Sequence, residues 1–211
     1  MSAATEEQQQ VPEPVRLERL WAGQFGDEYL DRNRTAGEFR GPFWNKLLDG
    51  IAVSRALEVG CNVGANLRWL AERLGPANVY GIDINLKALV ELRLSHPHVN
   101  AVSGPGRELP FRDRRFDLVF TAGVLIHQPD VTLPLVMSEI VRCSRRYVLC
   151  AEYCADRPSE VHYRGQQGAL FKRDYGRLYS DLFPALRLVD RGFLPRAEGW
   201  DDVTWWLFER A

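Results

Sequence analysis

A glycine-rich stretch, Leu57-Glu58-Val59-Gly60-Cys61-Asn62-Val63-Gly64-Ala65-Asn66, is typical of a strand that turns sharply into a helix around a ligand. Glycine lets the backbone turn and lets a ligand approach without meeting a Cβ atom. Asn62 stands where the pyrophosphate-binding G-x-G-x-x-G loop has its middle glycine. The pattern therefore favours a ligand without a pyrophosphate, and a tight turn without any ligand is the alternative.

A carboxylate ends the next predicted strand. Asp83 lies in Tyr80-Gly81-Ile82-Asp83-Ile84, about 20 residues beyond the glycine loop. An acidic residue at this place can accept hydrogen bonds from two ribose hydroxyls. The alternative is a cap for a helix that begins near Leu86. The pairing with the glycine loop at this spacing favours the ribose role.

Two side chains could take part in proton transfer. His127 follows the fourth predicted strand, and an ordinary imidazole titrates near neutrality. It could accept a proton from a hydroxyl or ammonium group of a bound small molecule. The alternative is a histidine with a purely structural role before Pro129. Tyr153 follows the fifth predicted strand and is the second catalytic candidate.

The stretch 161–174 combines glycines with cationic and aromatic side chains, which suits a loop over an anionic or polar small molecule. An arginine there could clamp an anion with two hydrogen bonds. For the cations at 172 and 173, a solvated surface is the simpler interpretation. The candidate substrate-binding residues are Glu152, His162, Tyr163, Arg164, Lys172 and Arg173.

No metal site is expected. His96-Pro97-His98 precedes a predicted strand and so belongs at the opposite edge of the sheet, and Cys150 and Cys154 have no histidines at ligand spacing. With Cys61 and Cys143, they are expected to be buried free thiols in a reducing cytoplasm.

Strand-like and helix-like segments alternate along the middle of the chain, which predicts a parallel sheet with helices on both faces. Ligands lie beyond the carboxyl ends of the strands in such sheets, where the candidate residues are. We expect a single-domain α/β fold, Rossmann-like, with a seven-stranded, mostly parallel sheet and an antiparallel C-terminal strand pair. The expected strands are 56–59, 78–84, 99–102, 116–121, 146–153, 186–193 and 203–209, and the expected helices are 66–74, 86–94, 133–143 and 171–183.

The expected domain organisation has three parts. Residues 1–14 are polar and Glu/Gln-rich and are predicted to be a disordered tail. Residues 15–50 are predicted to be a helical cap, in which Trp21, Phe25 and Tyr29 either cover a ligand or pack in the core. Residues 51–211 are predicted to be the main domain.

The order and spacing of these motifs resemble the class I S-adenosylmethionine-dependent methyltransferases over roughly residues 50–155. The resemblance also includes the Leu109-Pro110-Phe111 turn and Phe116-Asp117-Leu118-Val119. More narrowly, the stretches 21–29 with Arg32, 58–64, 163–165 and 170–174 resemble the methylases associated with pseudaminic acid biosynthesis.

This resemblance implies that S-adenosylmethionine is the cofactor and that the protein mainly positions the reacting groups. Glu58, Gly60 and Gly64 would hold the methionine end, Asp83 the ribose, and the segment 103–107 the adenine. The segment 121–123 would face the sulfonium. The implied cofactor-binding residues are Trp21, Tyr29, Arg32, Glu58, Gly60, Cys61, Asn62, Gly64, Asn66, Asp83, Ile84, Gly104, Thr121, Ala122 and Gly123.

Composition is that of an ordinary globular domain: 211 residues, 45% hydrophobic, 26% charged and a net charge of −1. The start of the chain lacks the pattern of a signal peptide, and no apolar run approaches the ~18 residues of a membrane span. We therefore expect a cytoplasmic protein that does not bind membranes and acts on a small-molecule acceptor. A homodimer is left open.

Three other functions stay open. A nucleic-acid methyltransferase is favoured by two arginine clusters, at 112–115 and 142–146, but opposed by the neutral charge and by the lack of an Asn/Asp-Pro-Pro-aromatic run. An NAD-dependent enzyme is opposed by Asn62. The third alternative is a non-catalytic protein of the same fold, because a fold by itself does not determine function. The methylated atom is not determined.

Overall fold

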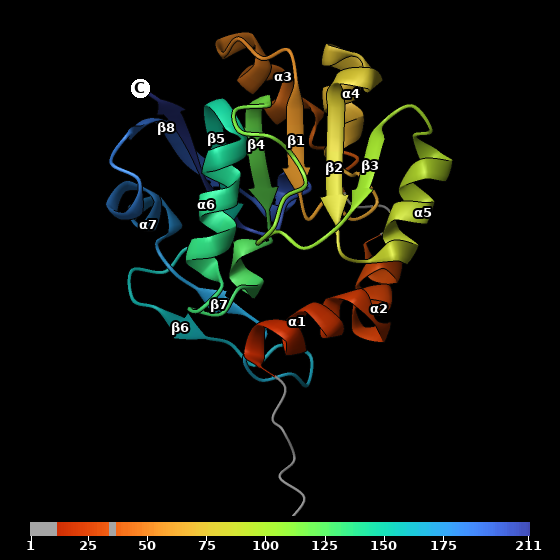
Figure 1. The fold of residues 1–211 in the computed structure, drawn as a ribbon, viewed down its shortest axis with the longest axis vertical. Coiled ribbons are helices and arrows are strands. Elements are labelled where there is room, and N and C mark those ends of the chain that lie inside the picture. The colour runs from red at the N-terminus through yellow and green to blue at the C-terminus, as the bar shows by residue number, and fades with distance from the viewer. Residues whose placement is uncertain (1–11, 34–36) are drawn as a thin grey trace, which may run out of the picture.

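A seven-stranded sheet runs through the protein in the order β3-β2-β1-β4-β5-β9-β8 (Figure 1). The computed structural model describes residues 12–33 and 37–211, so most of the predicted 1–14 tail lies outside the described residues. The first five strands in the chain are parallel and the last two antiparallel, which confirms the predicted fold class. The strands are β1 (Ala56–Val59), β2 (Val79–Asp83), β3 (Asn100–Ser103), β4 (Phe116–Ala122), β5 (Ser144–Glu152), β8 (Leu186–Leu194) and β9 (Val203–Arg210).

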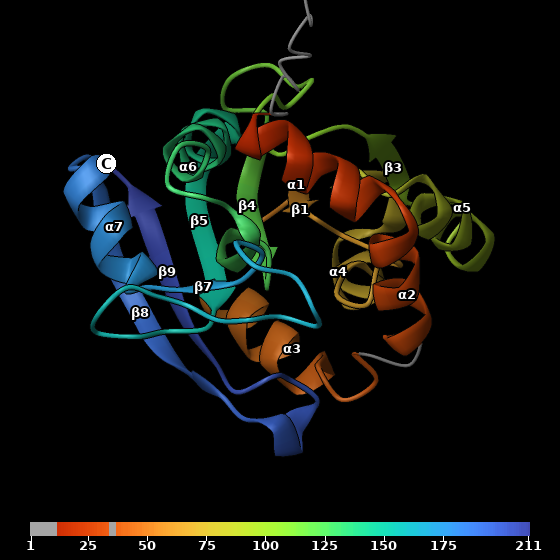
Figure 2. The same ribbon diagram turned by 90° about the horizontal axis from the view of Figure 1, so that it is seen from below.

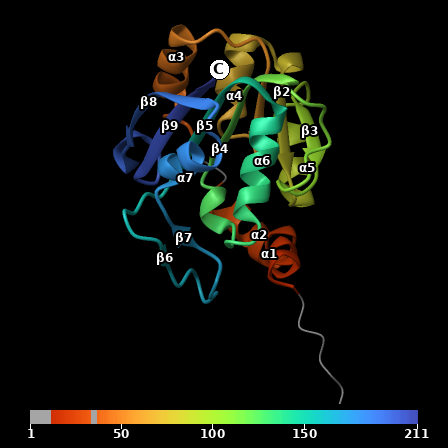
Figure 3. The same cartoon turned by 60° about the vertical axis from the view of Figure 1, so that its left-hand side comes forward.

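Helices cover both faces of this sheet, and for that reason its central strands are apolar on both sides. On one face, Leu57 and Val59 share a core cluster with Ile140. On the other face, Ala56 shares a core cluster with Leu70. Figure 3 shows α6 and α7 in front of the strands. The helices are α3 (Gly41–Gly50), α4 (Leu67–Leu74), α5 (Leu86–Ser95), α6 (Leu133–Cys143) and α7 (Tyr175–Leu182).

Two further helices, α1 (Glu13–Ala22) and α2 (Gln24–Arg32), cross the carboxyl ends of the parallel strands (Figures 1 and 2). With α3 they account for the helices expected before residue 51. The first of them begins at Glu13, so the boundary predicted after residue 14 falls inside a helix. Among the helices of the described residues, none combines the length and the apolar character needed to cross a membrane.

The helix predicted over 171–183 is wrong in its first part. Residues Phe171–Lys172 form a short strand, β7, that pairs with β6 (Ser159–Glu160). Helix α7 begins only at Tyr175, because the side chain of Asp174 accepts the N–H of Arg177 at 2.9 Å and caps the helix. Helical spacing of apolar residues cannot reveal a strand whose partner lies in another segment.

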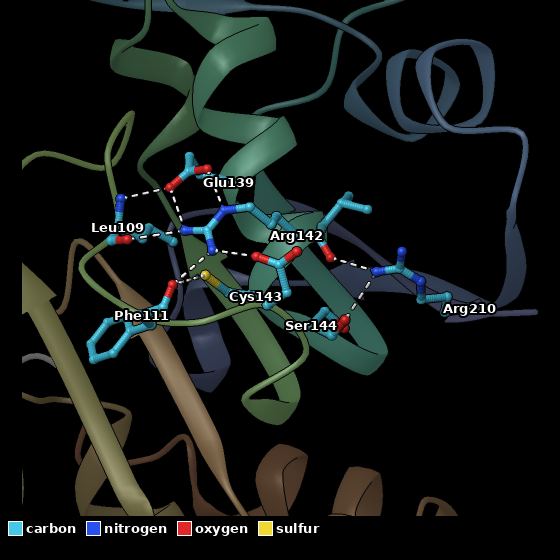
Figure 4. A network of polar contacts seen from close by, with 9 residues as sticks. Leu109, Phe111, Glu139, Arg142, Cys143, Ser144 and Arg210 are labelled. Atoms are coloured by element: carbon cyan, nitrogen blue, oxygen red, sulfur yellow. Dashed lines mark hydrogen bonds and ion pairs between the residues drawn. The ribbon is translucent and has the colours of Figure 1, made fainter.

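The Leu109-Pro110-Phe111 turn is held by an arginine of α6 (Figure 4). Arg142 donates to the carbonyl oxygens of Leu109 at 3.0 Å and Phe111 at 2.7 Å, and it also binds Glu139 and Asp113. Glu139 in turn accepts the N–H of Leu109 at 2.7 Å. The turn therefore has a structural role, because this network satisfies polar backbone groups between β3 and β4.

Candidate active site

A cavity of about 620 Å³ lies under α1 and α2, at the carboxyl ends of β1, β2, β4 and β5. Most of the predicted site residues line it, as the topology rule for parallel sheets requires. These are Trp21, Tyr29, Arg32, Glu58, Gly60, Cys61, Asn62, Asn66, Asp83, Ile84, Gly104, Ala122, Gly123, His127, Tyr153, Tyr163 and Arg164. The predicted residues that do not line it are Gly64, Thr121, Glu152, His162, Lys172 and Arg173.

The glycine loop between β1 and α4 adopts backbone angles that favour glycine. Gly60 has φ 74° and Gly64 has φ 81°, in the left-handed region. A Cβ atom at Gly60 would collide with Val124, and one at Gly64 would collide with Leu92. Because Gly60 has no side chain, the turn after β4 can pack directly against the glycine loop. Gly64 instead packs toward α5 and away from the cavity.

Asp83 sits at the tip of β2 and organises the loop around it. Its Oδ2 accepts the N–H of Asn62 at 2.7 Å, and its Oδ1 accepts the N–H of Asn85 at 2.8 Å. Burial raises the pKa of Asp83, and these N–H groups oppose the shift. A carboxylate has about four acceptor positions, so the two bonds to Asn62 and Asn85 do not exhaust its capacity to accept from ligand hydroxyls. The alternative role as helix cap belongs to Asn85, whose side chain accepts the N–H of Ala88.

Glu58 is buried at the end of β1, with 2% of its surface exposed. Its Oε1 accepts from Nδ2 of Asn66 at 2.6 Å, while its Oε2 has no hydrogen-bond partner among the described residues. Asn66 is oriented by two donors to its Oδ1, Arg40 at 3.1 Å and Trp44 at 3.2 Å. Burial raises the pKa of Glu58 to about 8. The arrangement leaves one carboxylate oxygen for a cationic group.

Arg40 is a cavity residue that the sequence did not indicate. Its Nε donates to the carbonyl oxygen of Gly199 at 3.0 Å, and its guanidinium lies 4.3 Å from the ring centre of Trp200. It thus joins the segment before β9 to Asn66. No motif marks an isolated arginine in a helical cap, because its partners come from distant segments. Other lining residues that the sequence did not indicate include Asn33, Asn85, Arg196 and Asp201.

Aromatic side chains of α1 and α2 form the roof of the cavity. Trp21 packs edge-on against Phe25 at 5.2 Å and Tyr29 at 5.4 Å, and Phe25 reaches Tyr163 at 6.0 Å. A polar contact joins α1 to the segment after β3: Arg107 binds Glu18 at 2.5 Å. Of the two predicted roles for the aromatic stripe, Trp21 and Tyr29 face the cavity, whereas Phe25 only supports them.

His127 is almost fully enclosed, with 8% of its surface exposed. Its Nδ1 lies 2.6 Å from the carbonyl oxygen of Ala169. Because a carbonyl can only accept, Nδ1 carries the proton and Nε2 has the free electron pair. Burial lowers the pKa of His127 to about 4, so the ring is neutral at pH 7 and the expected titration near neutrality is wrong. Burial raises the pKa of Tyr153 to about 12.

Four predicted substrate residues lie outside the cavity lining. Glu152 and Arg173 are buried, with 0% and 5% of their surfaces exposed, and Arg173 binds Asp130 at 2.7 Å. The ammonium of Lys172 lies 5.7 Å from the ring centre of Tyr153, and His162 is exposed. Thr121 is fully buried within β4.

The cysteines are free thiols, of which Cys61, Cys143 and Cys150 are buried as expected and Cys154 is exposed. Within 12–33 and 37–211, no group of three or more His, Cys, Asp or Glu side chains could hold a metal ion.

Sequence comparison identifies the family. Residues 56–146 match the family described as "Methyltransferase domain". An uncharacterized methyltransferase of Synechocystis is 30% identical over 149 residues, which cover 67% of this chain and 68% of that protein. Phthiotriol/phenolphthiotriol dimycocerosates methyltransferase 1 of Mycobacterium ulcerans is 37% identical over 97 residues. The match covers 45% of this chain and only 35% of the length of that relative.

Solved structures share the fold. The 1,6-didemethyltoxoflavin-N1-methyltransferase of Burkholderia thailandensis, with bound S-adenosylhomocysteine, has a TM-score of 0.73 at 18% identity, covering 96% of this chain and 92% of that one. Magnesium protoporphyrin IX methyltransferase of Synechocystis has a TM-score of 0.70 at 13% identity, covering 94% and 100%. The sequence matches show that this chain belongs to the methyltransferase family, as the resemblance predicted. The narrower resemblance to pseudaminic acid methylases stays a prediction.

Proposed function

We propose that this chain binds S-adenosylmethionine in the cavity and transfers its methyl group to an oxygen or nitrogen of a small polar or anionic metabolite. The observation that carries the proposal is the unpartnered Glu58 Oε2 in a cavity that also contains Arg40 and Asp83. A carboxylate and a guanidinium held by the two ends of one amide, Asn66, match the ammonium and carboxylate of an amino acid.

The cofactor residues follow from this match. Glu58 accepts the methionine ammonium, Arg40 binds the methionine carboxylate, and Asp83 accepts the ribose hydroxyls. Gly104 contributes a wall without a side chain toward the adenine. Gly123 lies at the end of β4 beside the reacting centre, with open space where a Cβ atom would be.

The bound cofactor supplies a methyl carbon already activated by a positive sulfur. The protein must align the acceptor with it and remove a proton where the acceptor is a hydroxyl or an ammonium. His127 suits the second task, since its neutral ring offers Nε2 as acceptor. Its low pKa makes it a weak base, which fits a reaction driven mainly by the cofactor. A carboxylate acceptor would need no base.

The acceptor is proposed to be held at the tip of a tight hairpin. Tyr163 and Gln166 exchange two backbone hydrogen bonds, of 3.0 and 2.9 Å, around Arg164 and Gly165. Both central residues have positive φ, 50° and 80°, as in a type I′ turn. An arginine in this region is unusual, and such strain gathers at functional sites. Arg164 lines the cavity and is placed to bind an anion.

Of the two arginine clusters that favoured nucleic acid, the one at 142–146 supports the small-molecule proposal instead. Arg142 binds Glu139 and Asp113, Arg145 pairs with Asp117, and Arg146 binds Glu209 at 3.0 Å. Guanidinium groups engaged by carboxylates are less able to neutralise phosphates.

A screen of acceptors tests the proposal. Purified protein with S-adenosylmethionine is incubated with small carboxylates and phosphates and with neutral analogues of similar size, and S-adenosylhomocysteine release is measured. We expect release with anionic acceptors, and a KM raised at least 10-fold in Arg164→Met, about 1.4 kcal/mol. Arg177→Met, on the exposed side of α7, is the control. Equal release with neutral analogues would contradict an anionic acceptor.

Cofactor binding should depend on pH through Glu58. In the free protein its pKa is about 8, so the carboxyl is largely protonated at pH 7. An ammonium at Oε2 favours the carboxylate, so binding releases a proton and the affinity falls as pH drops below about 8, by at most about tenfold per pH unit. Calorimetry in buffers of different ionisation enthalpy measures the released proton. Glu58→Gln should bind more weakly and lose this proton release; an unchanged release in Glu58→Gln would assign it to another group.

A further inference from the structure

The turn that follows β4 connects the two halves of the cavity. It includes Gly123, with φ 71°, and the short 3-10 turn Leu125–His127. Gly123, Val124 and His127 all line the cavity. Because Val124 packs against Gly60, the turn touches the glycine loop at one end and carries the candidate base at the other. Any shift of this turn would move both.

A buried carboxyl group lies directly behind this turn. Glu152 ends β5, and its Oε1 accepts the N–H groups of Val124 and Leu125, each at 3.2 Å. Its Oε2 accepts the N–H of Ile126 at 3.3 Å. The first N–H groups of a helical turn have no partner within the turn, so a single side chain here satisfies three successive donors.

Burying a carboxyl group to accept these three N–H groups costs free energy. Glu152 has no exposed surface, and burial raises its pKa to about 7. Transferring a carboxylate from water to an enclosed position costs free energy unless it is well hydrogen-bonded. Two carboxyl oxygens on one rigid group, however, can hold three N–H groups in a fixed arrangement, which a hydroxyl with one oxygen cannot do.

We propose that Glu152 is a positioning residue for His127: it fixes the 123–127 turn so that the imidazole is held with Nδ1 protonated and Nε2 free. The carbonyl oxygen of Ala169, 2.6 Å from Nδ1, orients the imidazole ring by a second contact. Glu152 itself does not line the cavity and acts through the turn. The inference rests on the proposed role of His127 as the base.

The test is a measurement on His127 that needs no acceptor. Long-range ¹H–¹⁵N correlation spectra of the full chain report the tautomer and the pKa of each histidine ring. The wild type is expected to show the Nδ1–H tautomer at His127. In Glu152→Gln the amide nitrogen cannot accept, so at least one N–H of the turn loses its partner. We expect mixed tautomers and a His127 pKa raised by at least one unit.

Two further variants keep the test decisive. Glu139→Gln alters another carboxyl that accepts a backbone N–H, from Leu109, but it lies outside the cavity lining and should leave His127 unchanged. Glu152→Asp keeps the charge with a shorter reach and should give a smaller shift than Glu152→Gln. If Glu152→Gln does not fold, by circular dichroism and melting, the aspartate variant carries the comparison. Unchanged His127 signals in a folded Glu152 variant would overturn the proposal.

Binding of S-adenosylhomocysteine to the wild type separates this inference from the proposed function. Binding together with unchanged His127 signals would contradict only the positioning role. No binding together with a shifted His127 would contradict the methyltransferase activity while leaving the link between Glu152 and the turn intact.

Discussion

Replacing Asp83 by asparagine is expected to weaken S-adenosylhomocysteine binding at least 100-fold, about 2.8 kcal/mol. The carboxylate already holds the N–H groups of Asn62 and Asn85, and the proposed ribose contacts use its remaining acceptor positions. A hydrogen bond to a charged group contributes ~1.5–3 kcal/mol, and the amide loses the charge together with one acceptor oxygen. Isothermal titration calorimetry of the folded variant measures the change.

A matched control separates this effect from a general loss of charge. Asp181→Asn changes an exposed carboxylate near the end of α7, where its partner is Arg177 at 3.4 Å. It should bind S-adenosylhomocysteine as the wild type does. If Asp83→Asn binds within threefold of the wild type, Asp83 does not hold the ribose.

The second large effect is expected from Gly60→Ala. A residue with a Cβ atom at φ 74° costs about 1–2 kcal/mol, and the crowding against Val124 adds about 1–3 kcal/mol. Relief of the crowding would shift the turn that carries His127 or the glycine loop itself. We expect a lower melting temperature together with loss of measurable S-adenosylhomocysteine binding.

Gly75→Ala is the control for backbone strain alone. Gly75 has φ 80°, and a Cβ atom there would meet its nearest neighbour, Asn78, only at 3.9 Å. It ends α4 away from the cavity, and its φ of 80° with ψ of 137° is a backbone conformation that favours glycine, so the variant should lose about 1–3 kcal/mol of stability and keep its affinity. If both alanine variants lose the same stability and both bind, close packing at Gly60 is not required.

Local sequence patterns predicted those site residues that lie at the end of a single strand or in the turn just after it. The turn at Gly60 and the carboxylate of Asp83 each depend on a strand and the residues just after it, so periodicity and spacing were enough. The order of strands and helices then placed these segments at one sheet edge through the topology of parallel sheets.

Residues that depend on distant partners were either missed or predicted with surroundings that differ from those in the structure. Arg40 is positioned by its hydrogen bonds to Asn66 and Gly199. These partners are far apart in the sequence, so no pattern of residue spacing predicts them. His127 was expected from its position after β4, but its enclosure by Trp21 and Ala169 depends on tertiary packing and lowers its pKa below the expected value. Glu152 was expected at the same edge, yet its side chain turns into the protein instead of the cavity.

The most direct test of the account is calorimetric titration of the purified protein with S-adenosylmethionine, S-adenosylhomocysteine and NAD. The account predicts that both sulfur ligands bind at micromolar concentrations and that NAD does not, because Asn62 replaces the middle glycine of a pyrophosphate-binding loop. Absence of binding by both sulfur ligands, or binding of NAD in their place, would contradict it.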